Sequence, residues 1–204
     1  MAQRTGPGVD KVYEIVRGLI RRLRFPVFEG GQTTRGIFVF VNGLISITLL
    51  SLLAWITRSP FIFPSLGPTA FVQFHRPLAT ASSPRNTIAG HLIGILARYG
   101  SLVIFGLANA PSATSEGVTV ARVGAAALSV AATSGMMVWL RVPHAPAGAT
   151  TLIVSLGILS RPRELLMIEL AVVLMTVQAF VINRLAGVNY PIWAAGEHKE
   201  AAGS

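Results

Sequence analysis

The sequence has no cysteine and very little charge. The absence of cysteine excludes disulfides, thiolate chemistry and cysteine-based metal sites. Only 12% of the 204 residues are charged and 52% are hydrophobic, which is typical of a membrane protein. The histidines are too scattered for metal-ligand spacing, and the chain carries no hydrolase or nucleotide-binding signature. We therefore expect no enzyme activity, no metal and no cofactor.

Acidic residues are also scarce, since 17 lysines and arginines face 8 acids and the net charge is +9. Seven of these basic residues precede residue 36, and residues 9–25 alternate apolar and basic positions as an amphipathic helix does. We interpret this pattern as contact with anionic lipid headgroups at the cytoplasmic surface, not with nucleic acid. The chain then divides into an interfacial region (1–35), a transmembrane domain (36–190) and a short polar tail (191–204).

Six hydrophobic segments follow the basic region. Four match the roughly 20 residues that span a bilayer, and two shorter ones are interrupted by proline and glycine. The long segments are residues 36–56, 87–110, 118–140 and 164–185, and the broken ones are residues 61–74 and 143–160. Unpaired backbone groups are costly in lipid, so a broken helix must line a cavity or be covered by protein. The broken segments are therefore candidate binding sites.

The two broken segments resemble each other, which indicates an internal duplication. Both combine prolines with a Gly-x-Thr sequence, at 67–69 and 148–150, and a Pro-Arg pair follows each of them. If all six segments cross the membrane, the loops place twelve basic residues on one side and three on the other. If only four helices cross and the broken segments are re-entrant, the split is nine to six.

The positive-inside rule favours six crossings, with both termini on the cytoplasmic side of the plasma (inner) membrane. The predicted fold is an all-α membrane protein of two inverted three-helix repeats, with the second segment of each repeat broken. The alternative is four spans plus two re-entrant segments.

Arg98 lies near the middle of a long segment, and the sequence holds no acidic residue between Glu29 and Glu116. A buried guanidinium needs a charged partner or an aqueous cavity. Either Glu169 serves as that partner or a transported anion does. We favour the anion.

The broken segments offer the other half of such a site. Backbone N–H groups around Gly67 and Gly148 and the hydroxyls of Thr69 and Thr150 are donors at the starts of half-helices, where the helix dipole attracts negative charge. Close packing through small residues is the alternative explanation of Gly-x-Thr, and the two are compatible.

Three further ionisable residues lie inside the long segments, where such groups are often functional. Arg122 and Glu169 each lie about one turn from the outer surface in the six-crossing arrangement, and we expect them to form an ion pair. His91 is expected near Asn42, close to the cytoplasmic surface. Proton coupling through His91 or Glu169 is the corresponding hypothesis.

Several motifs also resemble the HPP family of integral membrane proteins. Residues 144–150, HAPAGAT, are similar to the family's His-Pro-Pro-Ala-Gly-Ala-Thr signature, with Ala145 in place of the middle proline. Further similarities are Pro84-Arg85-Asn86 with Gly90-His91, Ser65 to Ala70, and Tyr190-Pro191 with Trp193. The likeness covers roughly residues 35 to 193.

The resemblance implies that Ser65, Asn86 and His144 also contact the transported molecule. Plant and cyanobacterial members are linked to nitrite transport, so it further implies a small monovalent anion as cargo, with nitrite the first candidate. Members are usually described with four transmembrane helices. The alternative function is a non-transporting membrane protein whose basic N-terminal helix recruits a partner or lipid. Transporter domains of this size often associate into homo-oligomers.

Overall fold

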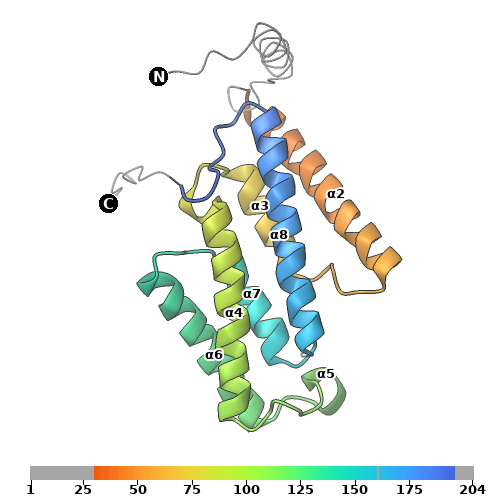
Figure 1. Cartoon of the computed structure of the whole chain (residues 1–204), viewed down its shortest axis with the longest axis vertical. Helices are drawn as coiled ribbons and strands as arrows, with labels where there is room; N and C mark the ends of the chain where they lie inside the picture. The colour runs from red at the N-terminus through yellow and green to blue at the C-terminus, as the bar shows by residue number, and fades with distance from the viewer. Residues whose placement is uncertain (1–29, 160, 196–204) are drawn as a thin grey trace, which may run out of the picture.

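The computed structural model describes residues 30–159 and 161–195, and within these ranges the chain is all-helical (Figure 1). The predicted interfacial helix of residues 9–25 lies outside the described residues. The elements are α2 (Gln32–Thr57), α3 (Leu66–His75), the 3-10 turn η1 (Thr80–Ser82), α4 (Pro84–Ile104), α5 (Ala113–Glu116), α6 (Val120–Trp139), α7 (Pro146–Ser155) and α8 (Pro162–Leu185). Four of them, α2, α4, α6 and α8, are long and apolar enough to cross a membrane, which confirms the all-α membrane class.

The two segments predicted to be broken each contain a helix of only ten residues, α3 and α7. That is half the length a membrane crossing requires. Prolines explain the late helix starts, because Pro64 and Pro143 disfavour helical backbone in the residue that precedes each of them. Pro146 then occupies the first position of α7, where its missing N–H costs nothing.

The short helices lie in the middle of the bundle, and the chain reverses direction at each step through α2, α3, α4, α6, α7 and α8 (Figure 1). Each short helix packs against the long helix before it and against one long helix from the other part of the chain. Thus α3 contacts α2 and α8, whereas α7 contacts α6 and α4. The larger core cluster joins α2, α3 and α8 around Phe74 and Met175, and a smaller one joins α4, α6 and α7 around Ile93 and Ala147.

The segment after α8 folds back onto the turn between α3 and α4. Tyr190 is fully buried, and its hydroxyl donates a hydrogen bond to the Ser82 carbonyl. Burial raises the pKa of Tyr190, so the hydroxyl stays protonated and remains a donor. The Arg85 N–H donates to the Trp193 carbonyl at 3.0 Å. These two contacts hold the segment after α8 against both η1 and the start of α4.

Glycines let α4 approach α7 closely. A Cβ atom at Gly90 would lie 2.8 Å from His144 Cβ, and one at Gly94 would lie 2.6 Å from Thr151 Oγ1 and 3.2 Å from the Ala147 carbonyl oxygen. Both positions therefore exclude a side chain unless α7 moves away.

We predict that Gly94→Ala lowers the free energy of unfolding by about 1–3 kcal/mol, because the added methyl group overpacks the α4–α7 contact. Gly100→Ala in the same helix is the matched control, since a Cβ there meets nothing within 4 Å. It should be neutral or stabilising by about 0.5–1 kcal/mol. Thermal unfolding in detergent measures both, and equal melting temperatures for the two variants would contradict the close approach.

Candidate functional site

The N-terminal turns of α3 and α7 cross each other inside the protein. Ser65, which precedes α3, has its Oγ 2.6 Å from Thr150 Oγ1 in the second turn of α7. His144, which lies just before α7, has its Nε2 3.4 Å from Thr69 Oγ1 in α3. All four side chains have no solvent exposure. The residue before α3 thus contacts the fifth residue of α7, and His144 before α7 contacts the fourth residue of α3.

His91 of α4 completes this group. Its Nδ1 lies 2.7 Å from Thr150 Oγ1 and its Nε2 lies 3.2 Å from Thr69 Oγ1. The His91 and His144 rings have centroids 5.0 Å apart. We call Ser65, Thr69, His91, His144 and Thr150 the hydroxyl–imidazole cluster. The structure therefore brings together five residues that the sequence had placed in two separate groups, one for binding and one for coupling.

The remaining predicted binding residues on the broken segments lie beside the cluster. Asn86 is buried and its Nδ2 donates to the Pro143 carbonyl at 3.5 Å, one residue before His144. Gly67 is exposed, and the Gly148 N–H donates to the Ala145 carbonyl at 3.0 Å. The expected free N–H group at Gly148 is therefore already bonded, because the first turn of α7 closes on itself.

Arg98 lies at the opposite end of α7. It is 1% exposed, and its Nε donates to the Val154 carbonyl at 3.0 Å. Arg122 donates from Nη1 to the Ser155 carbonyl at 3.1 Å and from Nη2 to the Pro111 carbonyl. Val154 and Ser155 are the last residues of α7, so both guanidinium groups bind the negative end of its dipole. The structure thus separates Arg98 from the helix N-termini against which the sequence had placed it.

The predicted ion pair between Arg122 and Glu169 is wrong. Backbone carbonyl groups occupy the Arg122 guanidinium, and both Glu169 carboxylate oxygens are buried without a hydrogen-bond partner in the described part of the chain. Arg122 and Glu169 were predicted to pair because they lie at equal depth in the membrane. Equal depth did not imply contact, because the guanidinium of Arg122 binds the C-terminal carbonyl groups of α7 instead. Asn42 likewise donates to Phe38 of its own helix at 2.7 Å and makes no hydrogen bond to His91.

Pairs of hydroxyl side chains between α6 and α7 extend from the cluster toward the C-terminal end of α7, where Arg98 and Arg122 lie. Thr133 and Thr151 have their Oγ1 atoms 3.1 Å apart, and the Oγ atoms of Ser129 and Ser155 are 2.6 Å apart. This ladder was not predicted from the sequence. Its signal was the four-residue spacing of the hydroxyl residues on both helices, which places them on one face of each.

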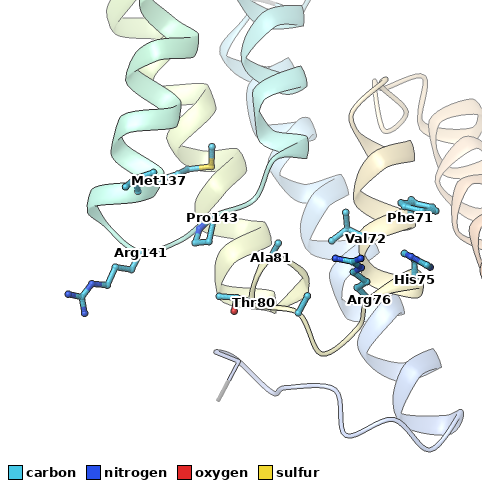
Figure 2. A pocket seen from close by; sticks show the side chains of 11 residues that line it. Phe71, Val72, His75, Arg76, Thr80, Ala81, Met137, Arg141 and Pro143 are labelled. Atoms are coloured by element: carbon cyan, nitrogen blue, oxygen red, sulfur yellow. The ribbon is translucent and has the colours of Figure 1, made fainter. Parts of the chain in front are cut away.

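A groove of about 870 Å³ opens next to the cluster (Figure 2). It is lined by Phe71, Val72, His75, Arg76, Ala79, Thr80, Ala81, Met137, Val138, Arg141 and Pro143. Ala81 and Pro143 connect it to the cluster, because His144 follows Pro143 and its Nδ1 lies 2.7 Å from the Ala81 carbonyl oxygen. Figure 2 shows Arg76 and Arg141 on opposite sides of the groove. From the sequence, both arginines were predicted only as loop charges.

Carboxylates are absent from both the groove and the cluster in the described residues. The acids there are Glu116, Glu164 and Glu169, in α5 and the first third of α8. None of them lines the groove or hydrogen-bonds to the cluster. Within the described ranges, the cluster consequently offers hydroxyls, imidazoles and helix N-termini without a negative side chain.

The family assignment rests on most of the chain. A family model described as the HPP transmembrane region matches residues 29–191. This chain belongs to the HPP transmembrane family. No curated protein and no solved structure gives a significant match. The match covers every helix described above, including both short ones, so the cluster and the groove lie within the HPP region.

We predict that Thr150→Val lowers the free energy of unfolding by about 1–3 kcal/mol, because it leaves the Ser65 hydroxyl and His91 Nδ1 without their buried hydrogen-bond partner. Thr57→Val is the matched control, since the Thr57 hydroxyl is exposed and bonds only to Leu53 of its own helix. Chemical or thermal unfolding of both variants measures the difference. An unchanged stability for Thr150→Val would show that the hydroxyl does not bridge these two groups.

Proposed function

We propose that this HPP protein transports a small monovalent anion and that the hydroxyl–imidazole cluster is its binding site. The observation that carries the proposal is the buried crossing of two half-helix N-termini. The positive ends of two helix dipoles converge there, and such termini bind anions in many proteins. In many secondary transporters, the ends of discontinuous helices form the central substrate site.

The side chains at the crossing suit an anion better than a cation. Ser65, Thr69 and Thr150 carry hydroxyl donors, and His91 and His144 carry imidazole N–H groups. A cation site of this depth would require carboxylates or several free carbonyl oxygens. No described carboxylate hydrogen-bonds to the cluster, so a bound negative charge would meet no like charge there, and the dipoles of both short helices have the right sign.

The groove provides the entrance in this proposal. Arg76 and Arg141 at its walls raise the local anion concentration, because clefts lined by one sign of charge attract the opposite sign. We place this end on the cytoplasmic side, since Arg35, Arg85 and Arg184 lie at the ends of helices that reach it (Figure 1) and basic residues concentrate on that side of membranes.

The two halves of the domain support a transport cycle of the inverted-repeat kind. Each short helix packs against the preceding long helix and the last long helix of the other half. The long helix before each of them is followed by an arginine with left-handed backbone, Arg58 with φ 51° and Arg141 with φ 55°. We propose that six segments form two inverted repeats, and that rocking of one half against the other exposes the cluster to alternate sides. Nitrite is the first cargo to test, given the family resemblance.

Nitrite uptake into proteoliposomes tests this proposal. Wild-type protein should transport nitrite, and Thr150→Val should reduce uptake about tenfold or more, because a hydrogen bond to a charged group contributes about 1.5–3 kcal/mol. Thr57→Val should transport like wild type. If wild-type protein neither transports nor is thermally stabilised by millimolar nitrite, nitrate, formate or chloride, the non-transporting alternative is favoured.

Removal of the groove charges should slow entry. We predict that the double variant Arg76→Gln/Arg141→Gln reduces uptake several-fold at low ionic strength, and that the difference shrinks in a high concentration of impermeant salt, which screens exposed charge. Arg163→Gln is the control, since it removes a charge near the start of α8 instead. Equal slowing by both changes would argue against the groove as the entrance.

A further inference from the structure

The hydrogen bonds of the cluster leave one imidazole nitrogen without a proton donor. The Ala81 carbonyl can only accept, so His144 Nδ1, 2.7 Å away, carries a hydrogen. A neutral imidazole has one N–H, and His144 Nε2 is therefore an acceptor. Its one hydrogen-bonding neighbour among the described residues is Thr69 Oγ1, at 3.4 Å.

The Thr69 hydroxyl has a closer acceptor. Its hydrogen points to the Ser65 carbonyl oxygen at 2.8 Å. Thr69 Oγ1 then accepts from His91 Nε2, Thr150 donates to His91 Nδ1, and Ser65 donates to Thr150. Every hydrogen of this ring is used, and His144 Nε2 receives none.

The other tautomer of His91 leads to the same shortage. With the hydrogen on Nδ1, His91 donates to Thr150, and the single Thr69 hydrogen must then serve the Ser65 carbonyl and both imidazole Nε2 atoms. At least one imidazole nitrogen lacks a donor in either arrangement. The cluster can therefore accept one more proton, and it has no hydrogen left to donate to a further acceptor.

An entering anion brings acceptors and no donors. We infer that one proton binds together with the anion, at His144 Nε2, and that the protein carries the two as an electroneutral pair. This inference rests on the proposed function. The protonated imidazolium supplies the missing donor and a compensating charge, so each ligand strengthens binding of the other.

Without the anion, the same proton is disfavoured. It would place a positive charge in a buried site beside the N-termini of two helices and the neighbouring His91 ring, with no carboxylate at hand. The other charged or titratable groups on the elements packed around His144 are His75 in α3 and Arg76 just after it, Arg85, Arg98 and Tyr99 of α4, and Arg122 of α6 with Arg141 just after that helix. None of them is negative, and η1 and α7 contain no such group. Protonation therefore depends on the anion.

The pH dependence of nitrite binding tests this inference. We expect the wild-type dissociation constant, followed by thermal shift or calorimetry, to tighten about tenfold for each unit by which the pH falls within the range where the empty site is unprotonated. Calorimetry in buffers of different ionisation enthalpy should show one proton taken up for each nitrite bound. This proton count needs no variant and so does not depend on how a mutant folds.

The variant His144→Asn distinguishes the role of Nδ1 from that of Nε2. The asparagine amide can still donate to the Ala81 carbonyl in place of Nδ1, but it has no counterpart of Nε2. We expect it to retain the fold, to bind nitrite more weakly and to lose the pH dependence. His198→Asn is the matched control, since His198 lies outside the HPP region of residues 29–191. It should keep the wild-type pH profile.

Flux measurements complete the test. A pH gradient, acidic outside, should drive uptake, whereas a potassium diffusion potential imposed with valinomycin should not. Protein-free liposomes correct for permeation of undissociated nitrous acid, and nitrate, the anion of a strong acid, provides a second probe. Nitrite binding without proton uptake, or flux driven by voltage, would overturn the inference and leave anion transport standing. Absence of binding at every pH would instead overturn the proposed function.

Discussion

Two helices of ten residues end inside a membrane domain, and the rest of the structure depends on how their backbone ends are satisfied. A helix end leaves N–H or C=O groups without partners inside the helix, and lipid supplies none. At the C-terminus of α7, the guanidinium groups of Arg98 and Arg122 supply the donors. At the N-termini, prolines remove some N–H groups, and tight turns such as Ala147 N–H to the His144 carbonyl occupy others. The long helices α4 and α6 therefore serve as partners for α7 as well as spans.

The two ends of the α7 dipole differ in whether a charged side chain compensates them. Arginines neutralise its negative end, whereas no described carboxylate neutralises its positive end. The positive potential of the crossing of α3 and α7 is consequently uncompensated within the described residues. Such a site is unfavourable for cations and for a permanently charged imidazolium, and it favours a negatively charged occupant. The proposed preference for an anion thus rests on charge balance along one short helix, and it does not require an arginine at the proposed binding site.

Much of this fold could be predicted from the sequence because lipid imposes strong local rules. Continuous apolar runs marked α2, α4, α6 and α8, and prolines marked the breaks at Pro64 and Pro143. The contacts within the site could not be predicted in this way. Ser65 and Thr150 are separated by 85 positions, and only packing decides that they meet. The partner of Arg98 is a backbone carbonyl, which every residue possesses, so no side-chain pattern could reveal it. The groove likewise combines residues of α3, η1 and α6 that share no sequence signal.

The contact between Tyr190 and the Ser82 carbonyl bridges 108 positions, and this separation bears on the order in which the protein folds. Ser82 adjoins Ala81, whose carbonyl holds His144. During synthesis the chain from α2 to α7 emerges before Tyr190 exists, so the turn that orients this histidine lacks its anchor until the segment after α8 has been made. Assembly of the hydroxyl–imidazole cluster is thereby coupled to insertion of α8. In a nascent chain stalled before that helix, the turn that binds His144 would lack the Tyr190 contact.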